Sequence, residues 1–358
     1  MLEKIIQENF KNKNSTKIDR SNFINLSNNY LAHPNVTEIM DEFFKELNKS
    51  LISNYPYYED TRERLKIFFK FSLNVDISLS SGTDSAIYYL MILAKELNLN
   101  KIFIQEHNYY AYYNYAKILD LNYMNISREE ICSINSYKIL ENIEPTFIFL
   151  VSPSCLTGLE IDFHTIRKFI IHAEKQGHFI FLDQAYAFFG TDLYLDLLKE
   201  FKNLTIIYTF SKAYASAGMR IGCIMSKNNL INRLREMGLE NSVSSISLCY
   251  LDFITKNNLD FKKYREDIIL WRNSTRNELI ELLTNKHINI FDSKANFISI
   301  DFKNKNVVDN IIDMCKNNHG IFIKSIFNYN GLFRCTITEP KIMRKIIIEI
   351  ENGIEKCL

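Results

Sequence analysis

The feature that most constrains the fold is an alternation, between residues 75 and 226, of short apolar runs with segments of helical periodicity. The apolar runs predict strands at 75–80, 101–106, 146–151, 178–183, 204–209 and 221–226. Amphipathic segments such as 84–97 and 163–176 lie between several of them and predict helices. This alternation favours a mostly parallel sheet covered on both faces. Ligands bind such sheets at the carboxyl ends of the strands, so the residues that follow each strand are the candidates for a site.

The pattern changes after about residue 240. A long helix is expected at 261–283, followed by a strand at 296–300, a helix at 307–316, strands near 321–324 and 332–337, and a last helix from Pro340. Strands and helices at this spacing suggest a smaller α+β domain.

Composition and charge exclude several classes of protein. The chain has 358 residues, 47% of them hydrophobic and 24% charged, as in ordinary globular proteins. The formal charge of +1 argues against a nucleic-acid partner, and no apolar run is long enough for a membrane span. The first twenty residues lack the shape of a secretory signal, and the seven scattered cysteines form no C-x-x-C pair. We therefore expect a cytoplasmic protein with reduced thiols, no structural zinc, and no nucleic-acid or membrane partner.

The sharpest chemical signal is Lys212, which follows a predicted buried strand within Tyr-Thr-Phe-Ser-Lys and precedes Gly-Met-Arg-Ile-Gly. Burial would lower the pKa of this lysine and make its free amine a nucleophile toward carbonyl groups. Thr209, Ser211 and Arg220 would supply donors to a phosphate group. The alternative is a solvated Lys212 and an Arg220 that serves only in an ion pair.

Two further strand ends carry polar residues. Asp183 ends an apolar strand, where an unpaired charge is costly, so a cationic partner such as a protonated ring nitrogen is expected. The alternative is a helix N-cap. Ser81-Gly82-Thr83-Asp84 lies between a strand and a helix, where free N–H groups and the helix dipole form an anion cradle. Plain helix capping is the alternative there.

Taken in order, these sites resemble those of the fold-type-I pyridoxal-phosphate enzymes, in particular class I/II aminotransferases of the histidinol-phosphate type. That family carries a phosphate loop, a ring-stacking aromatic residue, an asparagine near Pro-Thr-Gly, an aspartate, a lysine and a carboxylate-binding arginine. The matching residues here are Ser81-Gly82-Thr83-Asp84, Tyr110, the segment Ser-Pro-Ser-Cys-Leu-Thr-Gly at 152–158, Asp183, Lys212 and Arg334.

The resemblance runs from about residue 26 to the end, and it implies a fold and a cofactor. The cofactor would be pyridoxal 5′-phosphate. The fold would be α/β, with a large domain around a mostly parallel seven-stranded sheet and a small α+β domain. The expected division is 1–37 as an N-terminal segment joining the small domain, 38–243 as the large domain and 244–358 as the small domain.

The resemblance also implies roles for single residues around the cofactor. Lys212 would form the internal aldimine and act as general acid and base, Asp183 would face the pyridine nitrogen, and Tyr186 would donate to the phenolic oxygen. Tyr110 would stack on the ring, with Tyr109 as the alternative and a plain core aromatic as a further one. The phosphate group would be held by Ser81, Gly82, Thr83, Asp84, Thr209, Ser211 and Arg220.

Further matches concern the substrate and a second subunit. Arg334 would grip the substrate carboxylate, and Asn29, Tyr30 and Asn296 are assigned to the substrate site. Tyr55, in Asn-Tyr-Pro, would reach the phosphate of the other subunit, as the family's tyrosine does. These matches imply an obligate homodimer with shared active sites.

Cys155 departs from the family, which has an asparagine there that donates to the phenolic oxygen. A thiol is a weak donor, so the substitution either tunes a specialised reaction or is drift that Tyr186 compensates. An inactive relative and a one-residue misalignment are further alternatives. Residues 26–31 also depart from the family, and no basic residue is evident for a second phosphate group, which leaves histidinol phosphate open as the substrate. Glu106 and His107, at a strand end, are candidate substrate contacts.

The sequence thus predicts a pyridoxal-phosphate-dependent aminotransferase that moves an amino group between an amino acid, or a carboxylate-bearing amine, and a 2-keto acid. The same ring-binding residues would serve a decarboxylase or an elimination or replacement lyase, which is the first alternative. A catalytically silent relative is the second. Retention of Lys212, Asp183 and Arg334 together weighs against it.

Overall fold

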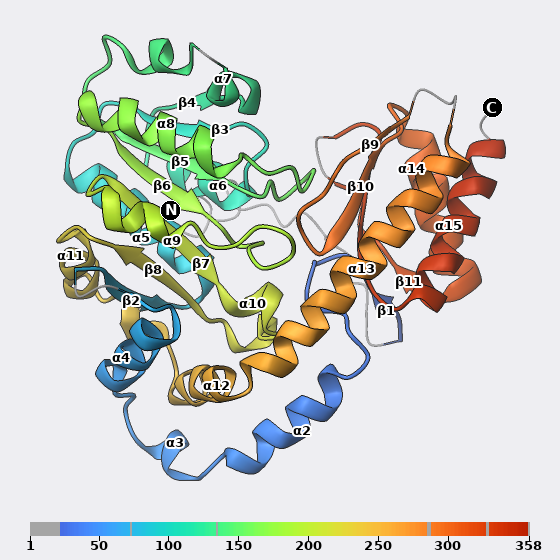
Figure 1. Cartoon of the computed structure of the whole chain (residues 1–358), viewed down its shortest axis with the longest axis horizontal. Coiled ribbons are helices and arrows are strands. Elements are labelled where there is room, and N and C mark those ends of the chain that lie inside the picture. The colour runs from blue at the N-terminus through green and yellow to red at the C-terminus, as the bar shows by residue number, and fades with distance from the viewer. Residues whose placement is uncertain (1–21, 72–73, 134, 285–287, 327–328, 357–358) are drawn as a thin grey trace, which may run out of the picture.

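The protein is built around a seven-stranded sheet, which the computed structural model shows beside a smaller second part (Figure 1). The structure describes residues 22–71, 74–133, 135–284, 288–326 and 329–356. The strand order is β2-β8-β7-β6-β5-β3-β4, with β8 antiparallel to both neighbours and the other pairs parallel. The predicted mostly parallel sheet is therefore confirmed. Its strands are β2 (Asp76–Ser80), β3 (Ile102–Gln105), β4 (Tyr123–Ile126), β5 (Phe147–Val151), β6 (Phe179–Asp183), β7 (Leu204–Thr209) and β8 (Gly222–Ser226).

The pleat of the central strands divides their side chains between two apolar layers. Phe149 and Phe181 stack with ring centroids 5.0 Å apart on one face, while Ile148 and Ile180 point to the other. Helices cover both faces, so these strands are apolar throughout (Figure 1). The first face packs against α5 (Gly82–Glu96), α6 (Tyr110–Ile118) and α11 (Leu230–Glu236), and the second against α8 (Phe163–Lys175) and α9 (Leu195–Glu200).

Strand β4 is the one strand of this sheet that the apolar pattern does not predict. It lies at the sheet edge beside β3, and its residues Tyr123 and Met124 are exposed. An edge strand in contact with solvent needs no apolar run, so its sequence carries little signal.

The second part is an α+β unit, as the pattern after residue 240 predicts. It holds an antiparallel sheet of β9 (Asn289–Ile290), β10 (Phe297–Asp301) and β12 (Leu332–Thr336), covered by α14 (Lys305–His319) and α15 (Pro340–Glu355). The N-terminal strand β1 (Ile24–Asn25) pairs in parallel with β11 (Ile321–Phe322), so both ends of the described chain meet here. The long helix α13 (Asn258–Leu282) runs from the large sheet to this part (Figure 1).

The remaining elements complete the large part. They are α2 (Val36–Glu46), α3 (Ser50–Ser53), α4 (Tyr58–Phe68), α7 (Arg128–Cys132), α10 (Phe210–Ala213), α12 (Ser245–Lys256) and the 3₁₀ turns η1 (Ser136–Leu140), η2 (Ala217–Met219) and η3 (Leu239–Ser242). Helix α12 follows the predicted domain boundary at residue 243, but it packs against α4 of the large part. The position of that boundary stays a prediction. The β1–β11 pair supports the placement of the N-terminal segment with the small part.

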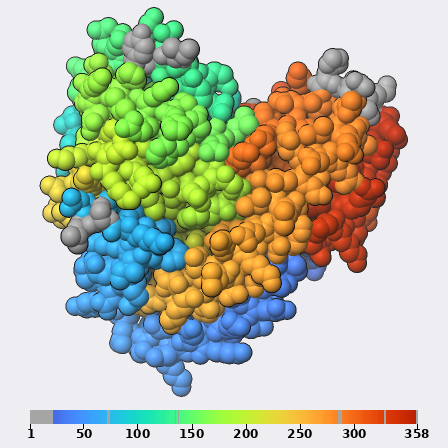
Figure 2. All heavy atoms as spheres, viewed as in Figure 1, coloured from blue at the N-terminus to red at the C-terminus, as the bar shows by residue number. Residues whose placement is uncertain are grey.

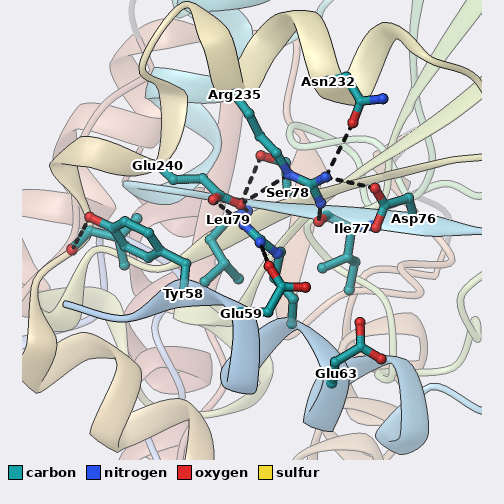
Figure 3. Close-up of polar contacts among 12 residues, drawn as sticks. Tyr58, Glu59, Glu63, Asp76, Ile77, Ser78, Leu79, Asn232, Arg235 and Glu240 are labelled. Atoms are coloured by element: carbon teal, nitrogen blue, oxygen red, sulfur yellow. Dashed lines mark hydrogen bonds and ion pairs between the residues drawn. The ribbon is translucent and has the colours of Figure 1, made fainter.

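A charged cluster lies at the β2 edge of the large sheet, opposite the β4 edge (Figure 3). The N–H of Leu79 in β2 and the hydroxyl of Ser78 both donate to Glu240 Oε1, at 2.9 and 3.0 Å. Arg62 Nη1 lies 2.5 Å from the other oxygen of Glu240, whose side chain is buried. The carboxylate thus satisfies an edge N–H that another strand would otherwise bind. It fixes the strand that leads into the predicted phosphate loop.

None of the helices in the described part of the chain combines the length and apolar character that a bilayer crossing requires. The six described cysteines are free thiols. Residues 1–21 and Cys357, which also entered the sequence-based expectations, lie outside the described residues.

Candidate active site

A cavity of about 1240 Å³ lies where the carboxyl ends of the large sheet's strands face the small part. In the space-filling view the two parts meet across a notch between the green and orange surfaces (Figure 2). Many of the predicted residues line the cavity: Asn29, Thr83, Asp84, Tyr110, Cys155, Asp183, Tyr186, Thr209, Ser211, Lys212, Arg220 and Arg334. The predicted residues Ser81, Gly82, Tyr30, Asn296 and Tyr55 are not part of the lining.

Lys212 lies in the single turn of α10, directly after β7. Its Nζ donates to the carbonyl of Asn28 at 2.8 Å. Desolvation, followed by the nearby charges of Arg334 and Arg220, lowers the pKa of Lys212 to about 8. About one tenth of the amine is therefore uncharged at pH 7, far more than for an ordinary lysine, and the uncharged form is the one that acts as a nucleophile or proton acceptor.

Asp183 ends β6 and is only 3% exposed. Its two oxygens accept hydrogen bonds of 3.0 Å, one from the N–H of Ala185 and one from the hydroxyl of Tyr112. Burial raises the pKa of Asp183 to about 6, and no ion pair to it is formed by any described residue. The cation that the sequence leads us to expect is thus absent from the described chain, and a protonated ring nitrogen of a ligand would meet the need.

The N-terminal turn of α5 and Arg220 form a cradle at one end of the cavity. Gly82 has φ +71°, and a Cβ built there would lie 2.9 Å from Nη2 of Arg220, so the position needs glycine. Arg220 Nη2 also pairs with Asp84 Oδ2 at 3.0 Å. Thr83 and Ser211 line the cavity beside them. Free helix N–H groups with an arginine and hydroxyls suit a phosphate group.

These three features fit pyridoxal 5′-phosphate. The cradle accepts its phosphate, Asp183 suits its pyridine nitrogen, and the amine of Lys212 suits its aldehyde. Among the described residues, no group of three or more His, Cys, Asp and Glu side chains could hold a metal ion.

Two neighbouring tyrosines compete for the position against the cofactor ring. Tyr110, the predicted residue, begins α6 and is 63% exposed. Tyr109 is half-buried and packs against the cluster that contains Cys155 and Tyr186. Tyr109 is therefore better placed to cover a planar ring inside the cavity, which favours the alternative in the sequence-based prediction.

Arg334 projects from β12 toward the large sheet. Its Nη1 donates to the carbonyl of Cys155 at 2.5 Å, and its guanidinium carbon lies 5.4 Å from the centre of the Phe297 ring. A second cation, Lys324, also lines the cavity just after β11. The sequence shows no evident basic residue for a second phosphate group, and Lys324 is a candidate for that task which the sequence analysis did not name. The signal was a lysine at the end of a predicted strand, 321–324.

The N-terminal segment reaches the cavity through Asn29, whose Nδ2 donates to the hydroxyl of Tyr186 at 3.0 Å. Asn296 Nδ2 donates to the carbonyls of Asn29 and Tyr30 at 2.9 and 3.1 Å. The Tyr30 hydroxyl donates to the carbonyl of Asn25. Asn296 and Tyr30 thus lie behind the cavity wall and hold the segment in place, which differs from their predicted contact with substrate.

Cys155 is buried in the position where the family has asparagine. Burial raises the pKa of Cys155 to about 12, so the side chain is a thiol. Its Sγ donates to the carbonyl of His107 at 3.5 Å. Burial likewise raises the pKa of Tyr186 to about 12, which keeps that hydroxyl a hydrogen-bond donor.

Tyr55 is fully exposed and does not line the cavity of its own chain. Ile52 and Tyr57 beside it are also largely exposed, at 80% and 81%. The role of Tyr55 toward a second subunit stays a prediction.

Comparison with known proteins identifies relatives over almost the whole chain. The family model described as aminotransferase class I and II matches residues 21–350. The histidinol-phosphate aminotransferase of Thermotoga neapolitana is 27% identical over 334 residues, which cover 92% of this chain and 93% of the relative.

Two solved structures share the fold. The histidinol-phosphate aminotransferase of Sinorhizobium meliloti, in complex with pyridoxal 5′-phosphate, gives a TM-score of 0.76 at 16% identity, covering 94% of this chain and 91% of the other. The L-threonine-O-3-phosphate decarboxylase of Porphyromonas gingivalis gives 0.77 at 19% identity, covering 93% and 99%. The expected fold type I is thereby confirmed.

Proposed function

Since the chain belongs to the class I and II aminotransferase family, we propose that Lys212 is the residue that moves the proton in its transamination reaction. The protein is a pyridoxal-phosphate-dependent aminotransferase, and its substrates are an amino acid or similar amine and a 2-keto acid. The observation that carries the proposal is a desolvated Lys212 amine, with a pKa lowered to about 8, in one cavity with Asp183 and Arg334.

The cofactor, when bound, supplies an aldehyde that condenses with amines and a ring that accepts electrons from the substrate's α-carbon. Thr83, Ser211 and Arg220, which line the cavity beside the turn at Gly82, would hold its phosphate. Because its pKa is lowered, Lys212 Nζ is suited to accept the proton from the α-carbon of the amino donor. The same nitrogen can then return a proton to the reacting carbon of the cofactor.

Asp183 would keep the pyridine nitrogen protonated, because its buried carboxylate is most stable beside a positive charge. Tyr112, which the sequence analysis missed, donates to Asp183 at 3.0 Å and orients it. The half-buried Tyr109 is our choice for the residue that covers the ring.

Arg334 and Lys324 give the substrate end of the cavity two positive charges. We propose that they bind the anionic group of the amino donor, which can be a carboxylate or a phosphate ester. The histidinol-phosphate aminotransferases among the relatives make a phosphate ester one donor to test. A decarboxylase shares the fold, but the family match supports transamination over bond cleavage of that kind.

A homodimer is the assembly we propose. The exposed side chains of Ile52, Tyr55 and Tyr57 support an interface there, because isolated proteins rarely expose such a group of large apolar residues. A cytoplasmic location is also proposed, and it is supported by the free thiols of the described cysteines.

The test of the proposed function is a panel of amino donors mixed with cofactor-loaded protein without any keto acid. Transamination predicts loss of the cofactor's visible absorption, one keto product per site, and no carbon dioxide. Carbon dioxide release without a keto product would support the decarboxylase alternative. Lys212→Ala should retain the cofactor and lose this conversion, while unchanged conversion would contradict the proposed role of Lys212.

A further inference from the structure

His107 and Tyr329 join the two parts of the protein across the cavity. His107 follows β3 of the large sheet, and Tyr329 lies between β11 and β12 of the small part. His107 Nδ1 and the Tyr329 hydroxyl are 2.5 Å apart, and the two rings meet edge to face with centroids 5.1 Å apart. Both residues line the cavity, so the pair forms part of its wall.

The backbone of His107 is held in an unusual conformation. Its φ is +59°, a left-handed value that few residues other than glycine adopt. The Cys155 thiol donates to the carbonyl of His107 at 3.5 Å, and the Tyr113 hydroxyl donates to the carbonyl of Gln105 at 3.0 Å. The thiol of Cys155 thus hydrogen-bonds to the backbone of His107. This cysteine therefore helps to hold His107 in place, independently of any contact with the cofactor.

The same turn presents hydrogen-bond donors to the cavity. Asn108 is only 6% exposed and lines the cavity, and its Oδ1 accepts from the N–H of Tyr109 at 2.7 Å. Its Nδ2 has no hydrogen-bond partner among the described residues. Between Tyr329 and His107 Nδ1, the phenol is a better donor than an imidazole N–H, so we assign the shared proton to Tyr329. The N–H of the His107 ring then lies at Nε2. A buried amide without a partner is costly, and a ligand acceptor would remove that cost.

We propose that His107, Asn108 and Tyr329 select the amino donor by its far end, and that they favour a group that accepts hydrogen bonds over a plain hydrocarbon. This inference rests on the proposed aminotransferase function. It names the substrate class more narrowly: amines whose side chain ends in an amide, hydroxyl, imidazole, carboxylate or phosphate. A site built to donate hydrogen bonds rejects an analogue that lacks the acceptor, because its own donors are then left unpaired.

The test compares two donors of similar size, L-glutamine and L-norleucine. We measure kcat/KM for each in the wild type, and equilibrium binding of each to cofactor-loaded Lys212→Ala protein by titration calorimetry. We expect the wild type to prefer glutamine by at least about tenfold in both measurements. Tyr329→Phe and His107→Ala should each reduce that ratio to about threefold or less, and Cys155→Ala should reduce it partly.

The matched control is Tyr194→Phe, which also removes a tyrosine hydroxyl bond but lies outside the cavity lining. It should leave the glutamine-to-norleucine ratio unchanged, and thermal unfolding should show that every variant is folded. A ratio near one in the wild type, or an unchanged ratio in both Tyr329→Phe and His107→Ala, would overturn the inference. If neither donor is converted but the binding ratio still responds to the variants, the proposed function fails with these donors and the inference stands.

Discussion

Replacing Asp183 by asparagine should make the cofactor-free protein more stable while weakening its hold on the cofactor. The carboxylate is 3% exposed, accepts one bond from the Ala185 N–H and one from Tyr112, and forms no ion pair with a described residue. Asparagine can keep both contacts, because its oxygen accepts from Ala185 and its amide can donate to the Tyr112 oxygen. The substitution therefore removes the buried charge and reverses the direction of the bond with Tyr112, whose hydroxyl proton loses its acceptor.

The magnitude follows from the pKa of Asp183, which burial raises from 3.8 to about 6. That difference corresponds to about 3 kcal/mol of destabilisation once the group is ionised in both the folded and unfolded states. The native state binds the proton more tightly, so the free energy of unfolding falls as pH rises from about 4 to about 6. Above pH 6 the cofactor-free wild type carries the full cost, and at pH 5 about half of it.

Urea unfolding of the cofactor-free proteins, at one protein concentration, measures this directly. Asp183→Asn should exceed the wild type by about 3 kcal/mol at pH 8 and by about half as much at pH 5. Asp76→Asn is the opposite control, because ion pairing and hydrogen bonds lower the pKa of Asp76 to about 2, and its loss should destabilise the protein at pH 8. The reasoning fails if Asp183→Asn is less stable than the wild type at pH 8, or if the difference does not change with pH.

Three other substitutions test separate parts of the account. Tyr109→Ala should weaken cofactor binding at least tenfold more than Tyr110→Ala in a fluorescence titration, because the exposed Tyr110 has less contact with the cavity; equal effects would restore Tyr110 as the ring-covering residue. Glu240→Ala should lower the free energy of unfolding by about 3–5 kcal/mol, because it removes a buried ion-pair partner. The control Arg64→Ala breaks an exposed pair with Asp252 and should cost less than about 1 kcal/mol. Similar losses in the two variants would contradict the role of Glu240 at the edge strand. Cys155→Asn should lower the pKa of the cofactor–lysine linkage in a spectral pH titration, because an amide is a stronger donor than a thiol, and an unchanged pKa would mean that this position does not reach the phenolic oxygen.

Much of the large sheet could be predicted because its strands are buried on both faces. The run before Asp183 is apolar and the run that ends in Thr209 is buried throughout, and the residues after them lie at the cavity as expected. Strand β4 could not be found this way, since its exposed edge position places no apolar demand on Tyr123 or Met124.

The parts of the site that escaped prediction come from contacts between distant segments. Tyr112 is one of several neighbouring tyrosines, and only the fold shows that its hydroxyl meets Asp183. Tyr329 and Lys324 reach the cavity from the small part, where strand patterns give no information about which loop faces the large sheet. Asn296 was expected at the substrate, but its amide is used by two backbone carbonyls of the N-terminal segment.

The central claim is that Lys212 moves the substrate proton in a pyridoxal-phosphate-dependent transamination. The most direct measurement is a single-turnover reaction of cofactor-loaded protein with an α-deuterated amino donor from the panel, followed by absorbance and by mass analysis of the product. The account predicts one keto product per site, a primary isotope effect in the wild type, and no measurable conversion by Lys212→Ala, which still binds the cofactor. Conversion by Lys212→Ala at a rate close to that of the wild type would contradict it.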